Sequence, residues 1–252
     1  MKQDVIDIIS NQSYRRENGE TISFTSAIDI DEAEFISWLI QKYHPVRTIE
    51  IGFAEGASSL AILDSLSGWK AEHTIIDPFQ STQWKNIGVN LLNKFGYSNF
   101  KLIEKKSEFA LPDLLENNEK FDLAFIDGYH TFDHTLLDAF YLTKMLNTGG
   151  LLIIDDVQMP AINKCIRYLY NYPCLRYVAS SKPGARTSSR KVVDTFKKSV
   201  GLVSGLMPSR LRSEVFDGSV LKSDPQLGLT SSMIAFEKVH EDEREWNWWK
   251  PF

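Results

Sequence analysis

Glu50-Ile51-Gly52-Phe53-Ala54-Glu55-Gly56-Ala57-Ser58-Ser59 is the stretch that decides the fold, because it joins a short apolar run to a helical pattern through two glycines. Gly52 permits a turn that residues with a Cβ rarely adopt, and Gly56 lets a ligand approach the backbone where a helix can begin. The glycines are four positions apart, so this loop differs from the GxGxxG dinucleotide fingerprint. A tight strand-to-helix turn would explain the loop equally well, and other residues must decide whether it binds a cofactor.

Short apolar runs and helical patterns alternate along the chain. The runs lie at residues 46–51, 74–76, 101–103, 123–126 and 151–154. Each of the first four precedes a segment with helix-like spacing, which is typical of a parallel sheet covered by helices on both faces. Further helices are predicted at residues 29–43 and 161–170, and further strands at residues 175–179 and 232–239. The sequence therefore predicts an α/β fold with a doubly wound, mostly parallel sheet of about seven strands.

The composition narrows the class of protein. The 252 residues are 43% hydrophobic and carry a net charge of −5, which disfavours a disordered chain or one that coats nucleic acid or an anionic membrane. The two cysteines support neither a disulfide framework nor a zinc knuckle. No signal peptide and no apolar run of 18 residues occurs in the sequence. We expect a cytoplasmic protein with a small-molecule partner and no nucleic-acid partner.

Two regions stand apart from the predicted sheet and its helices. Residues 1–28 resemble an N-terminal cover, and residues 29–252 form the expected main domain. Within the main domain, residues 181–228 form a long insert that is basic, and we expect it to act as a lid that could contact an anionic substrate or a membrane. Residues 241–252 form a tail rich in tryptophan that should pack against the domain or a neighbouring subunit of a homo-oligomer.

Acidic residues close several of the predicted strands. Asp77 ends the second strand about 20 positions after Gly56, where a carboxylate can accept hydrogen bonds from both hydroxyls of a ribose. Asp127 closes the fourth strand, and Asp155 and Asp156 close the fifth. These last three carboxylates should converge at one edge of the sheet, where their repulsion favours a bound cation and their hard oxygen atoms favour Mg²⁺.

A histidine follows the acid of the fourth strand. His130 lies three residues after Asp127, at the rim of the predicted crevice. A neutral imidazole there could accept a proton from a hydroxyl bound to the metal ion. His134 follows four residues later, but the segment lacks the HExxH pattern of zinc peptidases, and we interpret His134 as solvated or packed.

Together these motifs resemble those of class I S-adenosylmethionine-dependent methyltransferases. More narrowly, they resemble the metal-dependent O-methyltransferase branch that includes catechol, caffeoyl-coenzyme A and macrocin-type sugar enzymes, over residues 25–157. The resemblance assigns the methionine end of the cofactor to one loop, which contains Glu50, Gly52, Gly56 and Ser58. It assigns the ribose to Asp77 and the adenine to Ser107, within Lys106-Ser107-Glu108.

The same resemblance gives roles to the acids and to the histidine. Asp127-Gly128-Tyr129-His130 is similar to the Asp-Gly-x-His of the sugar-methylating subgroup, in which the aspartate binds metal and the histidine is the proposed base. Asp127 is expected to contact the cofactor as well. Asp155 and Asp156 stand where that subgroup has Glu-Asp and the catechol enzymes have Asp-Asn. The expected metal ligands are therefore Asp127, Asp155 and Asp156.

The resemblance implies a Rossmann-like methyltransferase fold with an antiparallel last strand and a long insert before it. It also implies S-adenosylmethionine and Mg²⁺ as cofactors, with methyl transfer to a hydroxyl of a sugar, a natural product or a phenol. Two other readings stay open: a metal-free methyltransferase of the same fold, and a non-catalytic protein that binds S-adenosylmethionine. A cephalosporin-hydroxylase-like group shares the fold and carboxylates of the macrolide-type enzymes, so the motifs alone do not decide the reaction.

Overall fold

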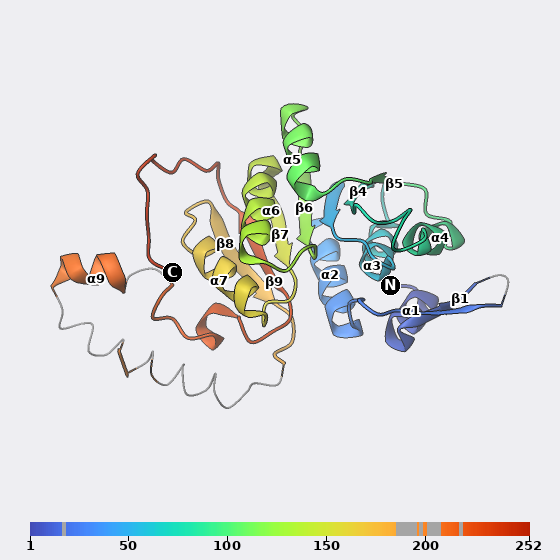
Figure 1. The fold of residues 1–252 in the computed structure, drawn as a ribbon, viewed down its shortest axis with the longest axis horizontal. Coiled ribbons are helices and arrows are strands. Elements are labelled where there is room, and N and C mark those ends of the chain that lie inside the picture. Colours follow the sequence, from blue (N-terminus) through green and yellow to red (C-terminus); the bar gives the residue numbers. More distant parts are fainter. Residues whose placement is uncertain (17–18, 185–195, 197–198, 201–207, 217–218) are drawn as a thin grey trace.

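The computed structural model describes residues 1–16, 19–184, 196, 199–200, 208–216 and 219–252, and a seven-stranded sheet lies at its centre (Figure 1). The strands are β3 (Arg47–Ile51), β4 (Glu72–Ile76), β5 (Phe100–Ile103), β6 (Phe121–Ile126), β7 (Leu146–Ile154), β8 (Leu175–Ser180) and β9 (Ile234–Lys238). Their order in the sheet is β5-β4-β3-β6-β7-β9-β8. Neighbours among β3 to β7 pair in parallel, whereas β9 runs antiparallel to both β7 and β8. The predicted doubly wound sheet with an antiparallel last strand is confirmed.

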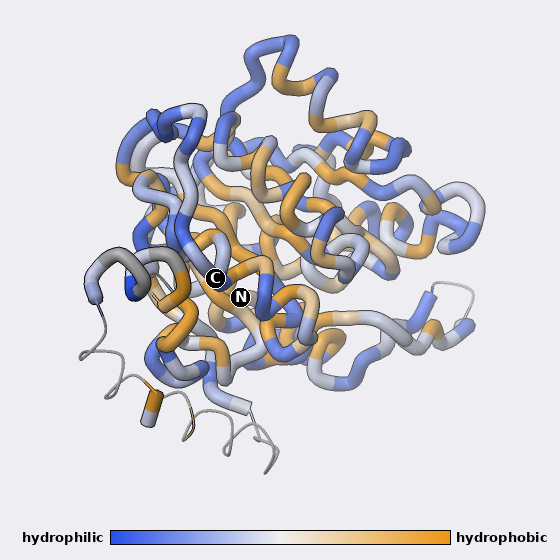
Figure 2. The backbone as a smooth tube through the Cα atoms, turned by 60° about the vertical axis from the view of Figure 1, so that its left-hand side comes forward, coloured by the Kyte–Doolittle hydropathy of each residue, from blue (hydrophilic) through white to orange (hydrophobic). Residues whose placement is uncertain are grey.

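Helices cover both faces of this sheet. They are α1 (Gln3–Asn11), α2 (Ile30–Tyr43), α3 (Ala57–Leu66), α4 (Ile87–Lys94), α5 (Ser107–Glu116), α6 (Phe132–Met145), α7 (Pro160–Leu169) and α9 (Ser209–Val215), with a short 3₁₀ turn η1 (Pro225–Leu227). One apolar core lies between the sheet and α1 to α4, and a second lies between the sheet and α5 to α7. Phe125 belongs to the first core and Ala124 and Ile126 to the second, because successive side chains of a strand point to opposite faces. The hydrophobic segments accordingly run through the interior (Figure 2).

The helix before the first parallel strand begins where the sequence predicts. The Asp29 carboxylate accepts a hydrogen bond from the Glu32 amide at 2.9 Å, and the Glu32 carboxylate accepts one from the Asp29 amide at 2.7 Å. This reciprocal capping box satisfies two amides that the first turn of a helix leaves unpaired. It fixes the N-terminus of α2 beside the carboxyl end of the sheet.

The N-terminal residues contribute to the first core. Val5 and Ile9 of α1 are fully buried there. A short hairpin follows, made of β1 (Ser13–Arg15) and β2 (Thr21–Ser23), which pair antiparallel. The chain then runs through residues 24–28, where the Thr25 amide and hydroxyl both donate to the Glu55 carboxylate, at 2.9 and 2.7 Å. The N-terminal segment is thereby fastened to the glycine-containing loop.

The predicted basic lid at residues 181–228 falls partly outside the described residues, which omit 185–195, 197–198, 201–207 and 217–218. Both ends of the insert are anchored where they are described. Lys182 pairs with Asp31 at 2.5 Å on one side. On the other, the buried Arg167 of α7 donates to the Ser219 and Lys222 carbonyls, each at 2.9 Å. Among the described helices, none combines the length and the apolar character required to cross a membrane.

Candidate active site

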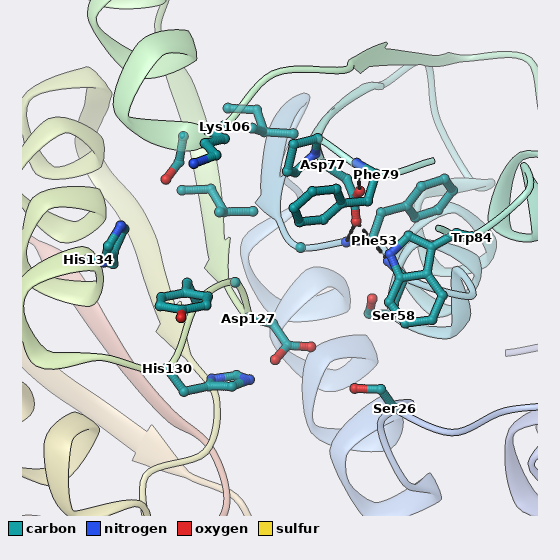
Figure 3. Close-up of a pocket in the computed structure, with 18 of the residues that line it drawn as sticks. Ser26, Phe53, Ser58, Asp77, Phe79, Trp84, Lys106, Asp127, His130 and His134 are labelled. Carbon is teal, nitrogen blue, oxygen red and sulfur yellow. Dashed lines mark hydrogen bonds between the residues drawn. The ribbon is translucent and has the colours of Figure 1, made fainter. Parts of the chain in front are cut away.

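A pocket of about 430 Å³ opens at the carboxyl ends of β3, β4 and β6 (Figure 3). Parallel strands place the residues that follow them at this edge, where ligands bind in open α/β sheets. Six of the residues predicted to form the site line the pocket, namely Gly52, Ser58, Asp77, Ser107, Asp127 and His130. Figure 3 shows Asp77 with Phe53, Phe79 and Trp84 at one end, and Asp127 with His130 at the other.

The two glycines of the loop after β3 are required by contacts with distant parts of the chain. Gly52 has φ +93°, and a Cβ there would lie 2.0 Å from the Asp127 carbonyl oxygen. Gly56 precedes α3 with φ +88°, and a Cβ there would lie 2.8 Å from the Gly88 Cα. Gly56 therefore lets α3 and α4 approach each other, and it does not line the pocket. Its predicted contact with a cofactor stays a prediction.

Asp77 holds this loop against the end of β4. Its Oδ2 accepts hydrogen bonds from the Phe53 and Ala54 amides at 3.1 and 3.0 Å, and its Oδ1 accepts one from the Phe79 amide at 2.7 Å. Three backbone donors fix the orientation of this carboxylate. Because each carboxylate oxygen has two acceptor positions, Oδ1 can also accept a hydrogen bond from a ligand in the pocket.

Glu50 lies behind the loop and outside the pocket lining. Its side chain is fully buried, its Oε2 accepts a hydrogen bond from the Ser59 hydroxyl, and His73 Nε2 lies 3.1 Å from the same oxygen. His73 Nδ1 in turn lies 2.8 Å from the Thr48 hydroxyl. This polar chain ties β3, β4 and α3 together beneath the glycine loop. The predicted contact of Glu50 with a cofactor also stays a prediction.

The acids after β6 and β7 meet the histidine. Three possible metal-binding atoms lie within 4.8 Å of one another: a carboxylate oxygen of Asp127, a ring nitrogen of His130 and a carboxylate oxygen of Asp156. His130 Nε2 lies 3.3 Å from Asp156 Oδ2. Asp155 is not part of that group among the described residues; its Oδ1 accepts a hydrogen bond from the Asp156 amide at 2.7 Å. The structure thus brings together two of the three predicted metal ligands and the predicted base.

Burial and the repulsion of nearby negative charges disfavour the charged forms of Asp127 and Asp155. Burial raises the pKa of Asp127 well above its ordinary value, and the negative charges of Glu50, Asp156 and Glu32 raise it further. Burial and the charge of Asp127 do the same to the pKa of Asp155. Acids crowded in this way retain protons unless a cation offsets their repulsion. The carboxyl end of the sheet is therefore suited to bind positive charge.

The part of the chain that builds this site has known relatives. Residues 49–157 match a family model described as "Methyltransferase domain". This part of the chain is therefore similar to methyltransferase domains. The chain is 32% identical over 134 residues to an uncharacterised protein of Acanthamoeba polyphaga mimivirus, covering 47% of this chain and 58% of the relative. It is 26% identical over 137 residues to a caffeoyl-CoA O-methyltransferase of Populus kitakamiensis, covering 52% of this chain and 54% of that protein. This chain thus spans little more than half the length of these two relatives.

Solved structures share the fold of this chain. An O-methyltransferase from Bacillus cereus, solved in complex with SAH, matches with a TM-score of 0.59 and 15% identity, over 73% of this chain and 86% of its own. The O-methyltransferase TomG from Streptomyces achromogenes, solved in complex with SAM, matches with a TM-score of 0.58 and 16% identity, over 73% of this chain and 85% of its own. At this identity the similarity shows that the fold is the same.

Several residues that line the pocket are not predicted from the sequence. Ser26 reaches the pocket from the segment before α2, and Trp84 from the loop after β4 (Figure 3). Neither lies in a recognisable motif. Glu32 affects the pKa of Asp127 and Asp155, but in the sequence its acidic side chain indicates only a helix N-terminus. His134 lines the pocket as well, with its Nδ1 2.9 Å from the Thr131 hydroxyl.

Proposed function

We propose that this chain is an S-adenosylmethionine-dependent O-methyltransferase that acts on a hydroxyl of a small molecule. One observation carries the proposal: a single pocket has the glycine loop and Asp77 at one end and Asp127 and His130 at the other, with Asp156 in contact with that histidine. The matched methyltransferase domain and the names of the relatives support it. Sugars, phenols and other natural products are the acceptor classes consistent with these residues.

The cofactor would lie along the carboxyl edge of β3 and β4. Asp77 and the backbone of the Gly52 loop would hold its ribose and methionine parts, with Ser58 and Ser107 at the walls of the pocket. The bound cofactor supplies an electrophilic methyl group. Because displacement at this methyl group needs little covalent assistance, the contribution of the chain is to orient the two reactants and to exclude water from the pocket.

A divalent metal ion fits the donor set at the other end of the pocket. Asp127 and Asp156 would hold it, and their crowded charges explain why a cation is favoured there. Asp155 lies outside this group among the described residues, and its Oδ1 accepts a hydrogen bond from the Asp156 amide. When bound, such an ion lowers the pKa of a coordinated hydroxyl. A histidine close to the acids is also compatible with softer ions such as Mn²⁺ or Zn²⁺, so Mg²⁺ is our proposal on the basis of the two carboxylates.

His130 would accept the proton of the acceptor hydroxyl. Its side chain is about one-third exposed, lines the pocket, and is oriented by Asp156 through the 3.3 Å contact at Nε2. A carboxylate beside an imidazole stabilises the imidazolium that forms when the ring takes up a proton. The alternative of a metal-free methyltransferase keeps this proton transfer and dispenses with the ion.

Isothermal calorimetry tests the cofactor assignment. S-Adenosylhomocysteine should bind with micromolar or tighter affinity, and Asp77→Asn should weaken it at least about tenfold, which is roughly 1.4 kcal/mol. Asp113→Asn is the matched control, because Asp113 is exposed and pairs with Lys105 at a distance from the pocket. Binding of NAD without binding of S-adenosylhomocysteine would overturn the proposed function.

A second titration tests the metal assignment. Mg²⁺ should bind the purified chain, and Asp156→Asn should weaken that binding by removing one anionic ligand. Asp133→Asn is the control, since the Asp133 side chain is 80% exposed and lies on the next helix. If a chelator removes all metal from the protein and methyl transfer is unaffected, the metal-free alternative replaces the metal-assisted one.

A further inference from the structure

Aromatic side chains that the proposed function does not use gather in residues 241–252, which we call the aromatic segment. Trp246 is 94% exposed and Trp249 is 62% exposed. Trp248 and Phe252 instead pack on α7, with ring centroids 6.3 and 4.8 Å from that of Tyr168. The prediction that this segment packs against the domain therefore agrees with the positions of these two side chains, while Trp246 extends into solvent.

Polar contacts hold the aromatic segment in place. Arg244 donates two hydrogen bonds to Asp242, at 2.7 and 2.6 Å, and its guanidinium lies 3.5 Å from the ring centroid of Tyr172. Near the other end, the buried Asn171 side chain donates to the Pro251 carbonyl at 3.0 Å. Planar ion pairs and cation–π contacts of this kind restrict a segment to one arrangement. Phe252 is thus presented in a defined position.

The contact of interest joins Phe252 to the first residue of α6. The rings of Phe252 and Phe132 are stacked, with centroids 6.1 Å apart and an interplanar angle of 6°. Phe132 is partly buried and also packs against the second core. It lies only two residues after His130. A shift of the Phe132 ring would therefore move the start of α6 and the turn that carries the histidine.

Two backbone hydrogen bonds lie within that turn and between it and the first residues of α6. The Thr131 amide donates to the Tyr129 carbonyl at 2.8 Å, and the Thr135 amide donates to the Thr131 carbonyl at 3.1 Å. These bonds fix the shape of the turn but not its position relative to Asp156, which follows β7. Phe132 packs between the second core and Phe252. This packing sets the position of the turn, because closely packed rings resist displacement.

We infer that Phe252 is a positioning residue for His130, acting through the stacked ring of Phe132. The aromatic segment thereby sets the 3.3 Å approach of His130 Nε2 to Asp156 Oδ2. The consequence for proton acceptance rests on the proposed function. The structural coupling between Phe252 and His130 does not rest on the proposed function, and it can be tested without a methyl acceptor.

Imidazole resonances measured by NMR on the full chain test the inference at one fixed pH. The sequence contains five histidines, and the spectrum of His130→Gln identifies the signal of His130. Phe252→Ala should shift the His130 signal by more than its linewidth while leaving those of His44 and His240 in place. Phe252→Tyr keeps the stacked ring and should restore the parental position.

Two further variants guard against a general loss of structure. Trp246→Ala removes an exposed ring of the same segment and should leave the His130 signal unchanged. Phe252→Leu keeps an apolar side chain but loses the planar stack, and it should shift the signal even if Phe252→Ala does not fold. An unshifted His130 signal in folded Phe252→Leu, or equal shifts of all five histidines, would overturn the inference. If the parental chain does not bind S-adenosylhomocysteine, the proposed function is overturned, but the coupling between Phe252 and His130 is not.

Discussion

Replacing Gly52 with alanine should lower the stability of the chain and disturb the candidate active site. A second glycine, Gly149, allows the cost of backbone strain to be separated from the cost of the steric contact. Gly52 and Gly149 have nearly the same backbone conformation, with φ of +93° and +87°. A Cβ at Gly149 would meet nothing within 4 Å, whereas a Cβ at Gly52 would lie 2.0 Å from the Asp127 carbonyl oxygen. Gly149→Ala therefore measures conformational strain alone, and Gly52→Ala measures the strain together with the contact.

The expected magnitudes follow from these two terms. A side chain in the left-handed region costs roughly 1–2 kcal/mol, which should be the whole cost of Gly149→Ala. At Gly52 the clash is with backbone, so no side-chain rotation relieves it, and overpacking adds roughly 1–3 kcal/mol. We therefore expect Gly52→Ala to lower the free energy of unfolding by about 2–5 kcal/mol. Relief of the clash must also displace the strand end that carries the Asp127 carboxylate.

Urea unfolding and calorimetry with S-adenosylhomocysteine measure the two consequences. We expect the midpoint of Gly52→Ala to fall well below that of Gly149→Ala. We also expect its affinity for S-adenosylhomocysteine to drop at least about tenfold, while Gly149→Ala binds as the parental chain does. Equal stability of the two variants, together with unchanged affinity in Gly52→Ala, would refute the reasoning that the loop after β3 is held tightly against the end of β6.

Three further predictions concern buried charge and the proposed base. Arg167→Ala should cost about 3–5 kcal/mol in unfolding measurements, because it removes a buried guanidinium that donates to Asp224 and to two backbone carbonyls. Arg176→Ala, which removes an exposed ion pair, should cost at most about 1 kcal/mol. Burial raises the pKa of Asp138 to about 6 from 3.8, so its contribution to stability is present below pH 3.8 and is lost as the pH rises through 6. The free energy of unfolding of Asp138→Asn should therefore rise, relative to that of the parental chain, by on the order of 3 kcal/mol as the pH increases from about 4 to 7. A difference between the two proteins that does not change with pH would contradict this. His130→Ala should lower methyl transfer by about 10²–10⁴-fold with cofactor affinity nearly intact, and full activity from about pH 6 to 9 would exclude it as the base.

The order and type of the main elements could be predicted from the sequence, because they depend on local pattern. Each buried strand is a short apolar run, and each run of the parallel part is followed by a helix-like spacing. Chain connectivity then places the carboxyl ends of these strands at one edge of the sheet. For that reason the sequence alone predicts that Gly52, Asp77, Asp127 and His130 share one pocket, as they do in the folded chain.

The tertiary structure alone decided how those side chains are used. The sequence treats Asp155 and Asp156 alike, yet a left-handed backbone at Asp156, with φ of 55°, sends it toward His130 while Asp155 turns to the Asp156 amide. Asp77 proves to bind the backbone of the glycine loop, and Glu50 lies behind that loop on Ser59. Such choices depend on hydrogen-bond partners and on which strand ends meet, and both are set by contacts between residues far apart in the chain.

The same physical reason explains the residues that the sequence did not reveal. Glu32 caps its own helix, a role that local pattern indicates, but the packing of α2 beside β6 and β7 also places its charge where it raises the pKa of Asp127. Phe252 and Phe132 are 120 positions apart and meet only because α6 and the aromatic segment both pack on α7. Local sequence determined which strands and helices form, since short-range periodicity controls burial. Long-range packing determined which charges and rings come together, because no local pattern records the distance between two elements in the folded chain.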